Sequence, residues 1–107
     1  MTIILTGNPC QSVDDVEAFK IDYTDHLGGD TLSGTPTVAL VTADSDVTIG
    51  TPANNTATYE DQDGVTVAVG KAVEFTLTAT STGTRWLLIT ATTSVRTIKR
   101  LLEVTIE

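Results

Sequence analysis

The stretch that decides the fold lies at residues 73–80 and reads Val-Glu-Phe-Thr-Leu-Thr-Ala-Thr. Apolar and polar side chains alternate along its whole length. A period of two residues is typical of a β-strand that buries one face and leaves the other in water. We therefore expect Phe75 and Leu77 to point into a core, and the threonines that alternate with them to face outward.

Strands with the same alternation are predicted on both sides of this stretch. Turn-forming residues separate them about every ten residues, which is typical of an antiparallel sandwich of two sheets. The expected fold is all-β and immunoglobulin-like, with about seven or eight strands. One helical turn is expected at 12–17, where Ser12 precedes acidic residues, and a loop at 26–30. The predicted strands are 17–23, 35–42, 47–49, 56–60, 65–69, 73–80, 85–93 and 98–106.

The inward-facing positions of these strands form the predicted core. In the strand at 65–69, the residues Val65, Val67 and Val69 share one parity and are expected to face inward together. The last strand has the same regularity, with apolar residues on one side and polar residues opposite. The side chains that we expect to be buried are Phe75, Leu77, Val67, Ile89, Leu102 and Val104.

The composition agrees with a single β-domain. The chain has 107 residues, a usual size for one domain that buries its core without disulfides. Threonine makes up roughly a fifth of the chain, and this residue favours strands. The first residues do not follow the strand repeat. We therefore expect an N-terminal arm at 1–14 and the β-sandwich domain at 15–107.

The charge balance argues against nucleic acid as a partner. With 14 acidic and 6 basic residues the net charge is −8, and such a chain repels phosphates. No apolar run has the length of a membrane span or the features of a signal peptide, so no membrane partner is expected. Four of the six basic residues lie in the last quarter of the chain, namely Arg85, Arg96, Lys99 and Arg100. They are either solvated surface or one side of a contact between copies.

The chain lacks the groups that catalysis needs. His26 is the only histidine and Cys10 the only cysteine, and no fixed spacing links them as base and nucleophile. One cysteine and one histidine do not supply a zinc site, and a lone cysteine forms no disulfide within the chain. We expect a protein that is not an enzyme and has no cofactor.

A calcium loop is the one metal site that the sequence leaves open. Residues 60–64 read Glu-Asp-Gln-Asp-Gly, so Asp61 and Asp63 supply alternating oxygen ligands before a glycine, as calcium loops do. The other acids of an EF-hand loop are missing, and Asp-Gly is also an ordinary hairpin turn. The segment is interpreted either as a plain turn or as a weak calcium site.

Two predicted strands carry apolar side chains on the face that is otherwise polar, and these side chains are candidate contacts with other proteins. Trp86 and Leu88 lie on the opposite parity from Leu87, so their strand is apolar on both faces. Such a strand is either central in the fold or covered by a partner. Leu101 is similarly apolar on the otherwise polar side of the last strand.

The arm has an apolar segment of its own, formed by Ile3, Ile4 and Leu5. A short arm that becomes ordered on binding can add a strand to the edge of a neighbouring sheet. We therefore expect this segment to make contacts outside its own domain.

Several short motifs resemble a family of small structural proteins of tailed bacteriophages. Residues 15–23 (Asp-Val-Glu-Ala-Phe-Lys-Ile-Asp-Tyr) are similar to the family's acidic pair and aromatic strand. Residues 27–32 (Leu-Gly-Gly-Asp-Thr-Leu) resemble its Gly-Asp-Thr turn. Residues 83–86 (Gly-Thr-Arg-Trp) and 92–100 (Thr-Thr-Ser-Val-Arg-Thr-Ile-Lys-Arg) resemble its closing strands.

The resemblance implies a virion component with an immunoglobulin-like domain, of the fibre-tail adaptor or head-decoration type. Such a protein is made in the host cytoplasm and becomes part of the virion. Its partners there are other virion proteins and its own copies, in a trimer or a higher homo-oligomer. The alternative function is an extracellular-type adhesion module that binds calcium or carbohydrate through its loops.

Overall fold

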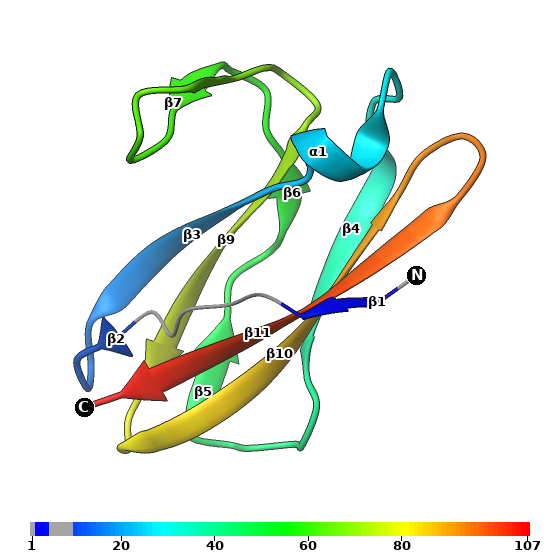
Figure 1. Ribbon diagram of the computed structural model, residues 1–107. Helices are drawn as coiled ribbons and strands as arrows, with labels where there is room; N and C mark the ends of the chain where they lie inside the picture. Colours follow the sequence, from blue (N-terminus) through cyan, green and yellow to red (C-terminus); the bar gives the residue numbers. More distant parts are fainter. Residues whose placement is uncertain (1, 5–9) are drawn as a thin grey trace.

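Two β-sheets lie face to face in the computed structural model, which describes residues 2–4 and 10–107 (Figure 1). A separate hairpin and a short helix, α1 (Thr24–Leu27), stand at one end of the sheets. The predicted all-β sandwich is thereby confirmed. The described residues form eleven strands rather than seven or eight, because several segments pair over only two or three residues.

The first sheet contains the longest pairing among the described residues. Its strands are β1 (Thr2–Ile4), β2 (Cys10–Gln11), β4 (Ser33–Leu40), β10 (Gly83–Thr92) and β11 (Thr97–Ile106). β10 and β11 form an antiparallel hairpin in which all ten residues of each strand are paired. β4 pairs antiparallel with the other side of β10, whereas β1 and β2 both pair parallel with β11.

The second sheet is centred on the stretch with the strictest alternation. Its strands are β3 (Val16–Asp22), β5 (Val47–Ile49), β6 (Ala53–Asn54) and β9 (Ala72–Ala79). β9 pairs antiparallel with β3, and β5 and β6 also pair antiparallel with β9. Phe19 of β3 lies opposite Phe75 of β9 in this register, and their rings stack with centroids 5.4 Å apart.

The core lies between the two sheets. Inward residues of β9, β10 and β11 form one cluster with the inward side of β3, as their alternation predicts. Five of the six expected core residues belong to this cluster, and Val67 is buried outside it, in the hairpin. The predicted residues confirmed as buried are Phe75, Leu77, Val67, Ile89, Leu102 and Val104.

The hairpin formed by residues 59–67 is shorter than the strands predicted at 56–60 and 65–69. It consists of β7 (Tyr59–Glu60) and β8 (Thr66–Val67), so both predicted strands shrink to two residues. Val65 and Val69 are 59% and 49% exposed, and the expectation that they face inward with Val67 is wrong. Val65 lies before β8 and Val69 lies after it, in a turn with Gly70 (φ 75°), so the alternation extends to neither residue.

A buried asparagine joins this hairpin to the second sheet. The Asn55 side chain is enclosed, and its Nδ2 donates to the carbonyls of Ala57 (3.0 Å) and Ala68 (2.9 Å). Its Oδ1 accepts from the backbone N–H groups of Lys71 and Ala72, both at 3.0 Å. All four hydrogen-bonding positions of the amide are therefore used by backbone groups.

The helical turn predicted at 12–17 is absent, and the chain there forms a turn before β3 begins. Asp14 has a φ of 67°, and the N–H groups of Val13 and Asp14 donate to the carbonyls of Glu107 and Ala79. These groups therefore connect strand ends instead of opening a helix. A helical turn occurs instead at α1, whose last two residues fall in the segment 26–30 that was expected to be a loop.

Part of the predicted arm pairs with the sandwich of its own chain. Ile3 and Ile4 belong to β1, whose backbone lies beside Arg100 and Leu101 of β11, and β2 pairs farther along the same strand. Leu5 lies outside the described residues. The backbone of β1 thus forms an edge of the first sheet of its own chain, and contacts of this segment outside its domain stay a prediction.

Candidate interaction surface

The outer face of the first sheet gathers the apolar residues predicted from β10 and β11. Alternation along β10 buries Leu87 completely and places Trp86 and Leu88 on the outer face. Leu101 has the equivalent place on β11, whose inward residues are buried. The structure therefore brings together three side chains that were singled out separately in the sequence.

The register of the hairpin makes these side chains neighbours. Leu88 lies directly opposite Leu101 on one side and Ala39 of β4 on the other. Trp86 lies opposite Glu103, in the pair two positions farther along the strands. Directly opposed side chains on one face are within contact distance. We call Trp86, Leu88 and Leu101 the outer patch.

Trp86 is a surface residue. Its side chain is 39% exposed, although Leu87, the next residue, has no exposed surface. The sequence left open whether this strand is apolar on both faces because it is central in the fold or because a partner covers it. The exposure of Trp86 places its side chain outside the core. A half-exposed tryptophan in the middle of a sheet is a typical anchor of a protein interface.

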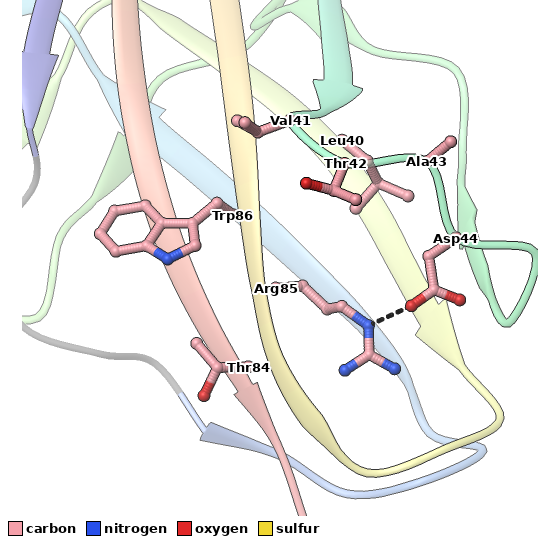
Figure 2. A pocket seen from close by; sticks show the side chains of 8 residues that line it. All are labelled: Leu40, Val41, Thr42, Ala43, Asp44, Thr84, Arg85 and Trp86. Carbon is pink, nitrogen blue, oxygen red and sulfur yellow. Dashed lines mark ion pairs between the residues drawn. The ribbon is translucent and has the colours of Figure 1, made fainter.

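A cavity of about 220 Å³ lies beside Trp86, where β4 ends and the chain leaves the sheet (Figure 2). The Val41 N–H donates to the Trp86 carbonyl at 2.9 Å, which continues the pairing of β4 with β10 beyond the end of the strand. The cavity is lined by Leu40, Val41, Thr42, Ala43, Asp44, Thr84, Arg85 and Trp86.

A charged cluster holds the loop that forms one wall of this cavity. Arg85 Nε and Asp44 Oδ2 form an ion pair with the two atoms 2.7 Å apart (Figure 2). The geometry of this pair is not that of a hydrogen bond. Arg85 Nη2 also donates to Ser81 Oγ at 2.9 Å, and that hydroxyl donates to Asp46 Oδ2 at 2.9 Å. The 44–46 loop is thus tied to the turn between β9 and β10.

A buried tyrosine and arginine connect the two sheets beneath the outer face. Tyr23 has no exposed surface, its hydroxyl donates to the Ile89 carbonyl at 3.3 Å, and burial raises its pKa to about 12. The guanidinium of Arg100 lies 5.1 Å from the centre of the Tyr23 ring and donates to the Asp22 carbonyl. Burial lowers the pKa of Arg100. Both groups therefore tie the end of β3 to the first sheet.

Sequence reasoning missed the role of Arg100. It has the same parity as Ile98 and Leu102 on the last strand, and that parity was recognised as the buried side. An arginine at such a position needs partners for its guanidinium inside the protein. The position of Arg100 on the buried side of β11 was therefore the sequence signal that indicated a role inside the protein.

A second groove lies between β3 and the β7–β8 hairpin. The Lys20 ammonium sits 4.4 Å from the centre of the Tyr59 ring, on the outer side of β3. Burial, and then the charges of Asp22, Glu74 and Asp61, raise the pKa of Tyr59 to about 12. The phenol thus stays protonated at neutral pH, beside an ammonium group of the same chain.

The candidate calcium loop forms the turn of this hairpin. Asp61 Oδ1 accepts the N–H groups of Asp63 and Val65, both at 2.9 Å, and Gly64 has a φ of 79°. This oxygen therefore organises the turn, as aspartate commonly does. Within residues 2–4 and 10–107 there is no cluster of three or more histidine, cysteine or acidic residues that would hold a metal.

His26 and Cys10, the residues considered as a base and a nucleophile, lie far apart. The His26 carbonyl accepts from Arg96, just before β11, whereas Cys10 in β2 pairs with Thr105 near the end of that strand. Nine residues of extended chain span about 30 Å. The structure does not bring this histidine and cysteine together.

A scan against protein-family models matches none, and searches of curated proteins and of solved structures likewise find no match. Among the helices of the described residues, none has the length and apolar character that would carry it across a membrane.

Proposed function

We propose that this chain is a non-enzymatic structural component of a tailed-phage virion, which assembles on the particle through protein–protein contacts. The observation that carries the proposal is the outer patch, Trp86 with Leu88 and Leu101 on one sheet face. Trp86 is exposed and the two leucines are half-buried on the face that points away from the core, so these side chains are available for association.

The surroundings of the outer patch support the same use. Threonines lie farther along both strands on the same face, so the apolar centre has a polar surround, as protein interfaces do. The neighbouring loop is held by the Arg85–Asp44 ion pair, so the surface beside Trp86 is organised before a partner binds.

The assignment to a virion is supported by the resemblance of residues 15–23, 27–32, 83–86 and 92–100 to the phage structural family. Its partners are then other virion proteins and further copies of itself, at the capsid surface, the head–tail junction or the fibre attachment site. The net charge of −8 makes packaged nucleic acid an unfavourable partner.

Mass spectrometry of purified particles tests this proposal. Particles encoded by the same genome are washed in high salt and their proteins are quantified. We expect many copies of the chain per particle, and we expect Trp86→Ser to be lost from the particles while remaining folded. The matched control is Val16→Ser, an exposed valine on β3 of the other sheet, which should be incorporated normally. A chain found only in the soluble fraction of the lysate would contradict the proposal.

A further inference from the structure

The outer face of the first sheet carries opposite charges at equal distances from its apolar centre. On β11, Lys99 and Glu103 lie two residues before and two residues after Leu101. All three have the same parity and therefore face outward. The rise of a strand puts each charge about 6.7 Å from Leu101.

Neither of these two charges is paired within the part of the chain that the structure describes. Lys99 lies opposite Thr90 and Glu103 lies opposite Trp86 in the β10–β11 register, so no opposite charge faces them across the hairpin. The ion pairs of the described residues involve other side chains. Lys99 is exposed and Glu103 is half-buried.

From this arrangement we infer that the outer face binds the same face of a second copy around a two-fold axis. The axis runs across the strands through Leu88 and Leu101, in the plane of the interface. It reverses the direction of the strands in the second copy. Lys99 of each copy then lies over Glu103 of the other, and the leucines of the two copies meet at the axis.

The geometry of packed sheets agrees with this contact. Two sheets pack about 10 Å apart, a gap that a lysine and a glutamate side chain bridge together. Packed sheets are also rotated by about 30°, which displaces groups 6.7 Å from the axis by roughly 3.5 Å. Both side chains are flexible enough to cover this displacement, so two ion pairs form symmetrically about the leucine centre.

The alternative two-fold axis, which runs along the strands, lacks this complementarity. It would place β11 of one copy over β10 of the other, with Glu103 over Trp86 and Lys99 over Thr90. The leucines would still meet, but neither charge would find a partner. The charges therefore select the axis across the strands, and they select a second copy of this chain as the occupant.

The expected contact is small. Three strands about 4.8 Å apart and about 30 Å long present roughly 400 Å² of flat area per copy. For the two copies together this is about 800 Å², which is below the roughly 1,200–2,000 Å² usual for specific interfaces, so we expect a weak and transient dimer. The contact is two-fold, so a trimer or a higher ring, as expected from the resemblance, would need a further surface.

The inference rests on the proposed use of the outer face in assembly, and charge reversal tests it. The full chain is studied by sedimentation equilibrium over a range of concentrations. We expect the wild type to dimerise reversibly. Lys99→Glu and Glu103→Lys each bring two like-charged pairs together in a homodimer, and each should raise the dissociation constant about tenfold or more. Glu17→Lys, an exposed change of the same charge on β3, should not affect dimerisation.

Two combinations separate pairing from a general effect of charge. The double variant K99E/E103K keeps the wild-type net charge and should dimerise like the wild type. A mixture of the two single variants should form heterodimers, because every facing pair is then opposite in charge. Failure of either combination to associate would overturn the inference. A wild-type chain that stays monomeric but is present in particles would overturn it while leaving the proposed function standing.

Discussion

Phe75→Ala is expected to lower the free energy of unfolding by about 3–5 kcal/mol. Phe75 is 3% exposed at the centre of β9, and its ring stacks on Phe19 at an interplanar angle of 22°. Truncation to alanine removes the buried ring and leaves a cavity that neighbours on two paired strands fill only in part. Urea unfolding followed by circular dichroism measures the change, with an unchanged slope showing that two-state behaviour is kept.

Val16→Ala is the control for this substitution. Val16 lies on β3 of the same sheet but is 69% exposed, so its truncation should change stability by less than about 0.5 kcal/mol. If Phe75→Ala leaves too little stability to measure, Phe75→Leu should give a smaller loss in the same direction. A Phe75→Ala protein as stable as the wild type would contradict the phase assigned to β9 and the core built on it.

Asn55→Ala is expected to cost about 3–4 kcal/mol, although the residue lies in a connector with little secondary structure of its own. The substitution leaves four backbone groups without the amide that they bond, two carbonyls and two N–H groups. Each loss contributes about 1 kcal/mol. Because these groups flank the β7–β8 hairpin on both sides and lie at the start of β9, we expect the hairpin to detach first. Hydrogen exchange of the Lys71 and Ala72 amides, together with urea unfolding, measures both effects.

Asn55→Asp separates the donor half of this amide from its acceptor half. The carboxylate still accepts from Lys71 and Ala72, but its second oxygen faces the carbonyls of Ala57 and Ala68. Burial beside carbonyl oxygens raises the pKa of such a carboxyl group, so its protonated form suits the site better. The variant should therefore lose stability as the pH rises above about 4.

The neighbouring Asn54→Ala is the matched control for both changes. It removes a single bond to the Gly34 carbonyl and should cost about 1 kcal/mol or less. Equal losses at the two asparagines would contradict the role assigned to Asn55.

The sequence pattern predicted the sheets better than it predicted the polar interior. Strict alternation in 73–80 identified the phase of β9, because each side chain there has only two directions available. The same reasoning located Trp86 on the face opposite Leu87. Asn55 was not predicted, because its partners come from four backbone positions that meet only after the chain has folded.

The outer patch was predictable only in part. Parity identified Trp86, Leu88 and Leu101, but their contact depends on the register between β10 and β11. That register follows from the turn at 93–96, where the Thr93 N–H donates to the Arg96 carbonyl. The sequence there has no glycine or Asn-Gly pair that would fix the turn in advance. The charges on either side of Leu101 acquire meaning only once this register is known.

The fluorescence of Trp86 during assembly tests directly whether the outer patch becomes buried. The chain has one tryptophan, so its emission reports on the outer patch alone. We expect the emission to shift to shorter wavelength, and acrylamide quenching to weaken, as the protein associates with itself or with particles. The change should follow the rise in mass measured on the same samples. Assembly that leaves the emission and quenching of Trp86 unchanged would contradict the claim that this chain acts through the outer face of its first sheet.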